Sequence, residues 1–319
     1  MILAPRVRLD APVIVLIGPT AIGKTELSLR IAERFGCEII SMDSMQVYRH
    51  MDIGTAKVSW EEQQRVTHHL IDIRNPDEQY DAASFVRDAL AAINTIGERQ
   101  KIPLLTGGTG LYLSSLLNGI FDEIAVKHEV REHLRGRLAS EGRAVLHQEL
   151  ARVDPESANR VHGNDTQRLL RGLEIYHSTG VPWSEHLRRQ QACQCGPRLT
   201  HVLLLGLRSD RESLHRRIEQ RTLKMMGDKF QQEVEFLLAQ GYAPTLASMQ
   251  SLGYRHMCAH LQGDWDLATA TRQLIVDTRR YAKRQMTWFR RYADLQWFDR
   301  NQHKMMIDSI SYFLDTSKN

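Results

Sequence analysis

The chain has 319 residues, of which 42% are hydrophobic and 25% are charged, and its formal net charge is +4. This composition is ordinary for a soluble globular protein with one large domain or two modest ones. The small positive charge indicates an anionic partner only weakly. No apolar run approaches the ~20 residues of a membrane-spanning helix, and charged residues interrupt the apolar N-terminus that a signal peptide would need. Four dispersed cysteines exclude a disulfide framework, so we expect a cytoplasmic protein without a membrane partner.

The N-terminal part of the chain alternates between strand and helix patterns. Val13–Ile17 is a short apolar run typical of a buried strand, and Lys24–Phe35 has the pattern of a helix that follows a glycine loop. A second apolar run, CEIISMDS, ends in polar residues. Residues 80–101 have helical periodicity, and residues 102–108 are another apolar run, which ends in glycine. Strands separated by helices predict an α/β fold with a parallel, doubly wound sheet.

In a parallel sheet of this kind, ligands bind at the carboxyl ends of the strands. Three polar or glycine-rich segments should therefore lie at one edge of the sheet: residues 18–25, Asp43 with Ser44, and residues 107–109. This edge is the predicted position of the functional site.

The middle of the chain has a different character. Residues 124–189 are charged and helical, with no strand pattern between the helices, and a strand pattern returns at residues 200–207. This change predicts a helical domain at residues 124–197, inserted into an α/β core made of residues 1–123 and 198–319. We expect the core to be mostly helical after residue 207.

The stretch after the first strand, GPTAIGKT, matches the phosphate-binding pattern G-x-x-x-x-G-K-[ST] completely. Its glycines let main-chain N–H groups converge on phosphate oxygens, and the N-terminus of the following helix adds partial positive charge. Lys24 would neutralise terminal phosphate oxygens, and the Thr25 hydroxyl would bind Mg²⁺. The predicted phosphate-binding residues are Gly18, Pro19, Thr20, Ala21, Ile22, Gly23, Lys24 and Thr25.

An enzyme that hydrolyses a nucleoside triphosphate usually also has an apolar strand that ends in an aspartate for Mg²⁺. The apolar run that begins at Ile102 ends in Thr-Gly-Gly-Thr instead. The apolar run that does end in an aspartate is the one before Asp43, directly after the helix that follows the glycine loop. The phosphate loop is therefore present without its usual partner for hydrolysis.

Several motifs together resemble the bacterial type of tRNA dimethylallyltransferase, also called tRNA isopentenyltransferase. They are GPTAIGKT, ISMDSMQVYRHMDIGTAK, HHLIDI, GGTGLY, RIEQR, LGYR and KRQMTWFR, and they extend from Gly18 to Arg290. The resemblance implies a P-loop NTPase-like parallel sheet flanked by helices, with an inserted all-helical domain. It also implies transfer of a dimethylallyl group from dimethylallyl diphosphate to the exocyclic N6 amine of an adenosine. This adenosine lies 3′ to the anticodon in tRNAs that read codons starting with U.

By this resemblance the glycine loop binds a prenyl diphosphate with Mg²⁺, and no hydrolysis is needed. An aromatic amine is a weak nucleophile, so the reaction needs a base near the amine and a stabilised leaving group. Asp43 is the predicted base. Arg221 is the predicted second clamp on the diphosphate, with Arg217 as a substitute one turn earlier. Thr109 would donate its hydroxyl to the bridging oxygen of the diphosphate.

The segment at residues 279–292 has six basic residues and no acidic one, and its aromatic side chains give it a surface suited to RNA. The resemblance implies that the inserted domain grips the anticodon stem-loop through residues 167–171, and that residues 44–46 line the flipped adenine. One departure from the family pattern is Gln250 with Ser251, where a basic residue is expected. The predicted tRNA-binding residues are Asp43, Ser44, Met45, Gln46, Gln167, Arg168, Leu169, Leu170, Arg171, Gly253, Tyr254, Arg255, Lys283, Arg284, Gln285, Thr287, Trp288 and Arg290.

Three other functions stay open at this point. A small-molecule or nucleotide kinase would use the same loop with Asp43 as the base for a hydroxyl group. An isopentenyltransferase that acts on free AMP would also use Asp43, whereas an RNA-binding module without catalysis would not need it. The helical insertion and the basic segment at residues 279–292 favour a macromolecular acceptor. We expect a monomer.

Two patterns resemble metal sites but do not predict one. Cys193 and Cys195 form a lone C-x-C without a second pair nearby. His128 and His133 are five residues apart, whereas a zinc-binding helix separates its histidines by four. We therefore expect Mg²⁺ to be the metal that this chain uses.

Overall fold

The computed structural model describes residues 8–9, 11–119, 126–193, 198–227 and 229–317. The chain forms two compact units. One contains residues 8–117 together with the residues after 197, and the other contains residues 118–197. The second unit thus begins slightly before residue 124, where the sequence analysis placed the start of the insertion.

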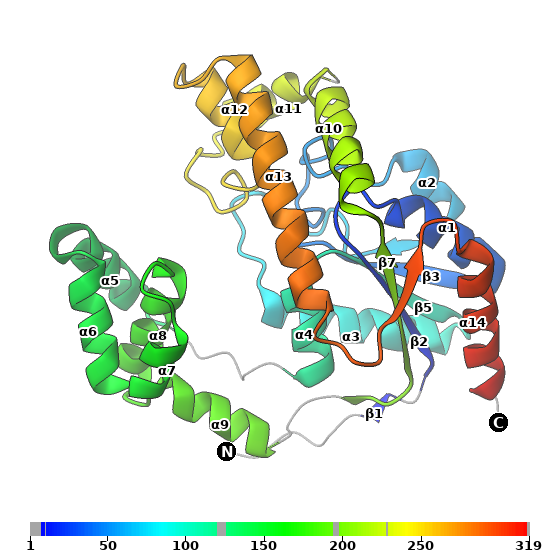
Figure 1. The fold of residues 1–319 in the computed structure, drawn as a ribbon, viewed down its shortest axis with the longest axis horizontal. Helices are drawn as coiled ribbons and strands as arrows, with labels where there is room; N and C mark the ends of the chain where they lie inside the picture. The colour runs from blue at the N-terminus through cyan, green and yellow to red at the C-terminus, as the bar shows by residue number, and fades with distance from the viewer. Residues whose placement is uncertain (1–7, 10, 120–125, 194–197, 228, 318–319) are drawn as a thin grey trace. The chain divides into compact units, whose positions relative to one another are not determined.

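The first unit is organised around a six-stranded sheet in which every pair of neighbouring strands is parallel (Figure 1). Its order is β4-β3-β5-β2-β7-β8, and a separate parallel pair is formed by β1 (Arg8–Leu9) and β6 (Arg198–Leu199). This arrangement confirms the predicted parallel α/β fold of the P-loop type. The strands of the large sheet are β2 (Val13–Ile17), β3 (Cys37–Met42), β4 (His68–His69), β5 (Ile102–Gly107), β7 (Val202–Arg208) and β8 (Gln296–Asp299).

The core of this unit lies around β2, whose five side chains are all fully buried. A strand that is apolar on both faces needs cover on both faces, which helices between parallel strands provide. The apolar pattern therefore predicted β2 correctly, and the predicted helix Lys24–Phe35 coincides with α1. The helices of this unit are α1 (Lys24–Phe35), α2 (Trp60–Arg65), α3 (Ala82–Glu98), α4 (Gly110–Asn118), α10 (Arg211–Gly227), α11 (Phe230–Ala239), α12 (Tyr254–Leu261), α13 (Leu267–Phe289) and α14 (His303–Thr316).

The part after residue 207 is mostly helical, as predicted, but it also contributes β8 to the edge of the sheet. This strand has only four residues, and one of them is buried. So short a run carries no clear alternation, which is why the sequence pattern did not reveal it. In Figure 1, α10 and α13 run alongside each other, and they are in contact.

The second unit is helical throughout the residues that the structure describes. Its small core is a leucine cluster in which Leu134, Leu146, Leu150, Leu169 and Leu173 are fully buried. Such a cluster suffices to hold a few amphipathic helices against one another. The helices are α5 (His128–Glu141), α6 (Arg143–Val153), α7 (Pro155–Arg160), α8 (Thr166–Thr179) and α9 (Trp183–Cys193).

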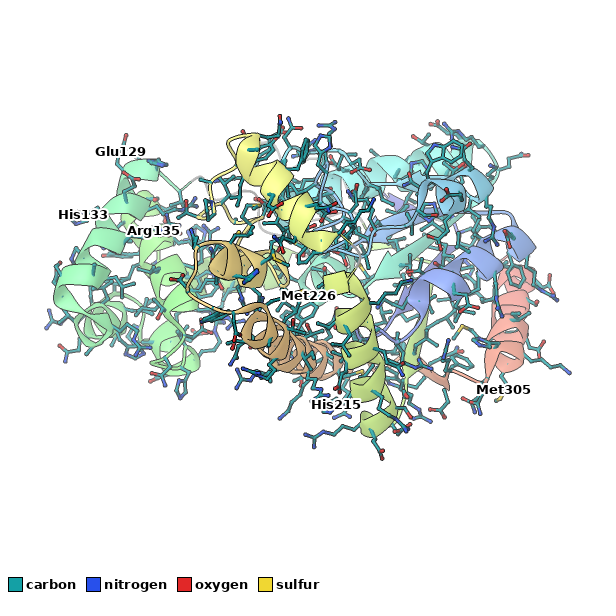
Figure 2. The ribbon with its side chains drawn as sticks, turned by 90° about the horizontal axis from the view of Figure 1, so that it is seen from above. Glu129, His133, Arg135, His215, Met226 and Met305 are labelled. Carbon is teal, nitrogen blue, oxygen red and sulfur yellow. The ribbon has the colours of Figure 1, made fainter. Side chains whose placement is uncertain are left out.

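His128 and His133 both lie on the exposed surface of α5, where Figure 2 labels His133 near Glu129 and Arg135. Among the described residues, no group of three or more His, Cys, Asp or Glu side chains could hold a metal ion. Cys193 is the last residue of α9, whereas Cys195 falls outside the described residues. A search of the described helices found none with the length and apolarity needed to cross a membrane.

A loop between β3 and α2, residues 51–58, is held from outside by α11 and α12. The carboxylate of Glu233 on α11 accepts hydrogen bonds from the main-chain N–H groups of Asp52, Ile53 and Gly54, at 3.0, 2.7 and 3.2 Å. Tyr254 donates its hydroxyl to the same carboxylate at 2.6 Å. Charge-assisted bonds of this kind are stronger than neutral ones. Helices late in the sequence therefore fix a loop that comes early in it.

We predict that Gly54→Ala destabilises the protein. A Cβ atom at Gly54 would lie 2.4 Å from the ring of Tyr254 and 2.5 Å from the ring of Phe230, and both side chains are fully buried. Overpacking of this kind costs about 1–3 kcal/mol. Urea denaturation would measure the loss in the free energy of unfolding.

Gly97→Ala provides the control, because Gly97 lies in α3 and an added Cβ would meet no atom within 4 Å. Replacing a helical glycine by alanine should stabilise the protein by about 0.5–1 kcal/mol. Equal free energies of unfolding for Gly54→Ala and the unmodified protein would contradict the proposed packing of the loop.

Candidate active site

The glycine loop follows β2 and ends at the first residue of α1, as the sequence pattern predicts. Gly23 has a φ of 101°, a left-handed conformation that a side chain disfavours, so glycine is required here. The Nζ atom of Lys24 donates hydrogen bonds to the carbonyl oxygens of Gly18 and Pro19, at 2.8 and 2.9 Å. The Lys24 ammonium is thus held over the loop whose N–H groups would bind an anion.

The charge of Lys24 is poorly solvated in this site. Burial lowers its pKa from 10.5 to about 7, while the nearby Asp43 carboxylate opposes the shift and Arg221 adds to it. Burial also lowers the pKa of Arg221, again opposed by Asp43. A lysine, an arginine and an aspartate therefore interact electrostatically in this site, where Lys24 and Asp43 are partly buried and Arg221 is exposed. An anionic ligand would stabilise both cations there.

Gln285 on α13 connects the glycine loop to the loop after β5. Its Oε1 accepts a hydrogen bond from the Thr20 N–H at 2.9 Å, and its Nε2 donates to the carbonyl oxygen of Gly108 at 2.8 Å. The side chain is only 4% exposed. This corrects the prediction that Gln285 contacts tRNA, because its amide is buried and bonded to the two loops of the site.

The glycines after β5 allow close approach of the backbone. A Cβ atom at Gly107 would lie 2.2 Å from the carbonyl oxygen of Met42, and one at Gly108 would lie 2.1 Å from Nε2 of Gln285. Thr109 follows, and its hydroxyl accepts a hydrogen bond from the Ser44 N–H at 3.2 Å. The ends of β3 and β5 are thereby joined at one edge of the sheet, as the strand order predicts.

Asp43 lies directly after β3 and forms a local turn, in which its Oδ1 accepts a hydrogen bond from the Met45 N–H at 2.8 Å. It lines two cavities, one of about 320 Å³ at the glycine loop and one of about 300 Å³. The two cavities adjoin, because they have several lining residues in common. The shared residues are Thr20, Ala21, Asp43, Thr55, Arg221 and Tyr281.

Two arginines of α10 form hydrogen bonds with the glycine loop. Arg221 donates to the hydroxyl of Thr20 at 3.3 Å, and Arg217 donates to the carbonyl oxygen of Ile22 at 3.1 Å. Figure 2 shows α10 in the first unit with His215 and Met226 labelled along it. Arg221 lines both cavities, whereas Arg217 lines the first one only. Arg221 is therefore the better placed of the two for a group that spans the cavities.

Tyr281 is a site residue that the sequence analysis did not identify, since its aromatic ring suggested either core or RNA surface. It lies four residues before Gln285 on α13 and lines both cavities. Burial and the Asp43 carboxylate raise the pKa of its hydroxyl well above the usual value for tyrosine. The available signal was the i,i+4 spacing from Gln285, which puts both residues on one helix face.

The predicted RNA-binding segment is largely exposed on and after α13. Lys283, Arg284, Thr287 and Arg290 are exposed, and Trp288 is partly buried. The helix ends at Phe289, so Arg291 lies beyond it. The Arg291 guanidinium nevertheless lies 4.8 Å from the centroid of the Trp288 ring. A mixed cationic and aromatic surface is therefore present.

The structure contradicts the predicted RNA contact of Tyr254, whereas that of Arg255 stays a prediction. Tyr254 is fully buried and bonded to Glu233, so its ring cannot stack on a base. The prediction for Tyr254 is therefore wrong, because α12 packs on the loop at residues 51–58 and buries this ring. Arg255 is exposed but pairs with Asp277 at 2.6 Å, and it lines the second cavity. Gly253, with a φ of 92°, directly precedes α12.

In the second unit, the predicted RNA-binding residues lie in the first turns of α8. Gln167 and Arg168 are exposed, and Arg168 forms an ion pair with Asp165. Arg171 is half-buried and lies 3.8 Å from Glu174. Leu169 is fully buried in the leucine cluster, so the predicted contact of its side chain with RNA is corrected.

Comparisons with known proteins agree with the motifs of this site. The family described as IPP transferase matches residues 46–292. The tRNA dimethylallyltransferase of Desulfotalea psychrophila is 48% identical over 308 residues, which cover 97% of each chain. That of Desulfosudis oleivorans is 47% identical over 290 residues, which cover 91% of each chain.

Solved structures give the same result. The tRNA isopentenylpyrophosphate transferase of Bacillus halodurans is 36% identical, with a TM-score of 0.70 and coverage of 96% of this chain and 98% of that one. A eukaryotic dimethylallyltransferase acting on tRNA is 29% identical, with a TM-score of 0.81 and coverage of 96% and 80%. The family model and these structures each match most of the chain, including the segments that follow β3, β5 and β7. The chain belongs to the IPP transferase family.

Proposed function

We propose that this chain transfers a dimethylallyl group from dimethylallyl diphosphate to the N6 amine of the adenosine 3′ to the anticodon, in tRNAs that read codons starting with U. The observation that carries the proposal is the position of Asp43 and Arg221, which both line the two adjoining cavities. One cavity contains the glycine loop and Gln46, and the other contains Ser44 and Met45, which are expected at an acceptor base. Asp43, the proposed base, and Arg221, the proposed diphosphate ligand, would therefore both lie where the two substrates react.

At the diphosphate end, the glycine loop at residues 18–25 would bind phosphate oxygens through its N–H groups. Lys24 and Arg221 would neutralise the charge that develops on the leaving diphosphate as the C–O bond breaks. Thr109 would donate a hydrogen bond to the bridging oxygen. The strand β5 ends at Gly107 and is followed by Gly108 and Thr109, so it lacks the aspartate with which a hydrolase usually holds Mg²⁺.

The residues of the first cavity fit a bound Mg²⁺. Mg²⁺ prefers oxygen ligands and keeps several waters. The described lining offers the hydroxyl of Thr25, the carboxylate of Asp43 and the hydroxyl of Thr106, whose Oγ1 is buried without a hydrogen-bond partner in the described part of the chain. We propose that Thr25 contributes to holding the ion together with the diphosphate and water. When bound, Mg²⁺ would supply further positive charge to the leaving group.

At the acceptor end, the exocyclic amine of adenosine would donate its proton to the Asp43 carboxylate as the new N–C bond forms. Ser44, Met45 and Gln46 follow Asp43 in the chain and would contact the flipped base. The exposed basic residues Lys283, Arg284 and Arg290 would bind phosphates of the RNA, together with Arg168 and Arg171 of the second unit. We further propose that the protein acts as a monomer in the cytoplasm.

One set of incubations distinguishes this function from its alternatives. Purified protein is incubated with Mg²⁺ and labelled dimethylallyl diphosphate, together with either tRNA or AMP, and the labelled product is identified. The proposal expects label on tRNA at the adenosine 3′ to the anticodon. Label on AMP would indicate a free-nucleotide enzyme, and phosphate transfer from labelled ATP would indicate a kinase.

Asp43→Asn should lower turnover by roughly 10²-fold or more, because an amide cannot accept the proton of the amine and positioned bases contribute on this scale. Its affinity for tRNA should change little. Single-turnover transfer to an anticodon stem-loop measures the effect, and Asp308→Asn on the exposed surface of α14 provides a control. Unchanged turnover in Asp43→Asn would remove this carboxylate from the mechanism.

Binding of the diphosphate should take up a proton at Lys24. Burial holds the pKa of this lysine at about 7, so above pH 7 the side chain is neutral in the free protein. A bound diphosphate favours the charged form, so its affinity should fall as pH rises above 7, by up to about tenfold per pH unit.

Titration calorimetry at pH 8, in two buffers that differ in ionisation enthalpy, would measure the proton uptake. Lys24→Met is the matched variant, since it retains the length of the side chain but cannot bind a proton. Equal proton uptake by both proteins would show that another group is responsible.

Lys283→Gln should weaken tRNA binding and make it less dependent on salt. Lys283 is exposed on α13, in the segment without acidic residues. Loss of one phosphate contact should reduce the slope of log affinity against log salt concentration by about 0.7–0.9. Filter binding over a range of KCl concentrations would measure the slope. Lys304→Gln, at an exposed position of α14, should keep the slope of the unmodified protein.

A further inference from the structure

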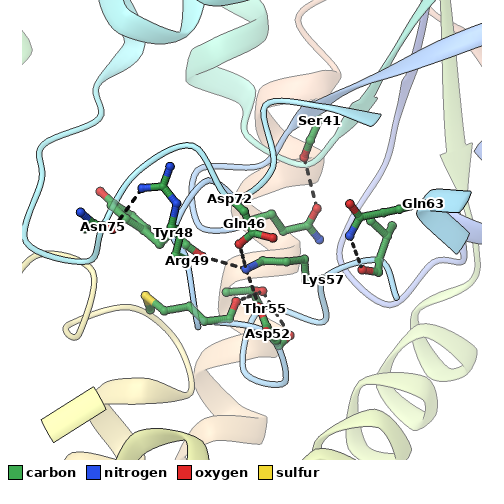
Figure 3. Close-up of polar contacts among 12 residues, drawn as sticks. Ser41, Gln46, Tyr48, Arg49, Asp52, Thr55, Lys57, Gln63, Asp72 and Asn75 are labelled. Atoms are coloured by element: carbon green, nitrogen blue, oxygen red, sulfur yellow. Dashed lines mark hydrogen bonds and ion pairs between the residues drawn. The ribbon is translucent and has the colours of Figure 1, made fainter. Parts of the chain in front are cut away.

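We propose that Lys57 is a positioning residue that fixes the side-chain amide of Gln46 and thereby the preference of the site for adenine. This inference deepens the proposed function and rests on it. It begins from the hydrogen bonds of Lys57, which lies between β3 and α2 and also contacts Asp72 after β4. Figure 3 shows this network, with Lys57 at its centre.

The ammonium group of Lys57 is enclosed by three oxygen atoms. Its Nζ lies 2.7 Å from the carbonyl oxygen of Tyr48, 2.5 Å from Oδ1 of Asp52 and 2.6 Å from Oδ1 of Asp72. The Lys57 side chain is 3% exposed, although Asp52 and Asp72 are partly exposed. An ammonium has three N–H donors, and here each one has an acceptor. The position of the Lys57 side chain is therefore well defined.

These contacts connect Lys57 to the backbone around Gln46. The N–H of Asp72 donates to the carbonyl oxygen of Gln46 at 3.2 Å, and the N–H of Ile73 donates to that of Val47 at 2.9 Å. Lys57 also holds the carbonyl of Tyr48, two residues after Gln46. The Lys57 ammonium thus binds Tyr48, which follows Gln46 closely in the chain, and Asp72, whose N–H binds the Gln46 carbonyl.

The side chain of Gln46 is fixed at both ends of its amide. Its Nε2 donates to the carbonyl oxygen of Ala56 at 3.2 Å, and its Oε1 accepts from the hydroxyl of Ser41 at 3.2 Å. Because a carbonyl oxygen can only accept, the bond to Ala56 determines which end of the amide is the NH₂ group. Ala56 directly precedes Lys57 and has a φ of 47°, in the left-handed region. Its carbonyl is therefore held in place by the anchored lysine.

In this orientation Gln46 has one N–H donor and one oxygen lone pair left for a ligand. A donor and an acceptor side by side match the N7 and N6 atoms of adenine, which is how glutamine and asparagine recognise this base. Gln46 and Ala56 line the first cavity, at the glycine loop, and Asp43 lines both this cavity and the adjoining one. Release of the Ala56 carbonyl would let the amide rotate and lose this match.

The network around Lys57 and the bonds made by Glu233 have Asp52 in common, but they use different groups of it: its carboxylate pairs with Lys57, and its N–H donates to Glu233. Glu233 accepts from the N–H groups of Asp52, Ile53 and Gly54, none of which depends on Lys57. Asp52 and Asp72 are exposed enough to be solvated by water when Lys57 is removed. Replacing Lys57 should therefore release Ala56 and Gln46 without unfolding the loop.

The test compares two anticodon stem-loop RNAs, one with adenosine at the acceptor position and one with an abasic nucleotide there. The ratio of their dissociation constants measures how much the base contributes to binding. We expect Lys57→Met to reduce this ratio at least fivefold, with little change in the affinity for the abasic RNA. Gln46→Ala should reduce the ratio to a similar extent. Lys304→Met, at an exposed lysine, should leave the ratio unchanged.

The double variant decides whether Lys57 acts through Gln46. If it does, Lys57→Met combined with Gln46→Ala should have the same ratio as Gln46→Ala alone. An unchanged ratio in Lys57→Met, or losses that add in the double variant, would overturn the inference. A uniform loss of affinity for both RNAs would overturn it as well, since that is the effect of general destabilisation.

Two further measurements keep the outcome unambiguous. If thermal denaturation shows that Lys57→Met does not fold, Lys57→Met with Asp72→Asn removes one of the two facing carboxylates, and its ratio replaces that of the single variant. The unmodified protein must itself prefer the adenosine RNA and transfer the dimethylallyl group to it. Failure there would reject the proposed function, whereas failure of the Lys57 variants alone would reject only this inference.

Discussion

The site depends on one buried amide, that of Gln285. It accepts from the N–H of Thr20 in the glycine loop and donates to the carbonyl of Gly108 after β5, so a single side chain of α13 sets the spacing between two strand ends. The bond to the Gly108 carbonyl is buried, and leaving this carbonyl without a hydrogen bond would cost about 1–3 kcal/mol, whereas the bond to the Thr20 N–H is part-buried. The amide therefore couples the sheet edge to the helix that also carries Tyr281 and the exposed basic residues.

Around this link the chain concentrates charge, because Asp43 and Arg221 line both cavities and Lys24 lines the first one. Lys24 and Arg221 both contact the glycine loop, and burial lowers the pKa of both, whereas the Asp43 carboxylate opposes this shift. Such an arrangement is costly in the free protein and becomes favourable when a multiply charged anion binds. The same aspartate borders the second cavity, so the anion site and the acceptor site are electrostatically connected.

Two groups brace the loop at residues 51–58, and they do so by different means. Glu233 takes up three consecutive N–H groups from outside, while the Lys57 ammonium gathers three oxygens within the fold. In each arrangement one charged group has several hydrogen-bond partners, which favours a single geometry for the loop. A rigid wall next to Asp43 suits a reaction that depends on placing one amine against one carbon.

The sequence by itself determined the features that depend on local pattern. The apolar run of β2, the helix α1 and the glycine loop between them were predicted with correct bounds, because residue spacing and backbone freedom decide them. The motifs also identified the family. Only the tertiary structure decided that Tyr254, Leu169 and Gln285 are buried, that Tyr281 lines the site and that β8 joins the sheet. Burial depends on which distant segments meet, and Gln285 bonds to a residue 265 positions away, beyond the reach of any local pattern.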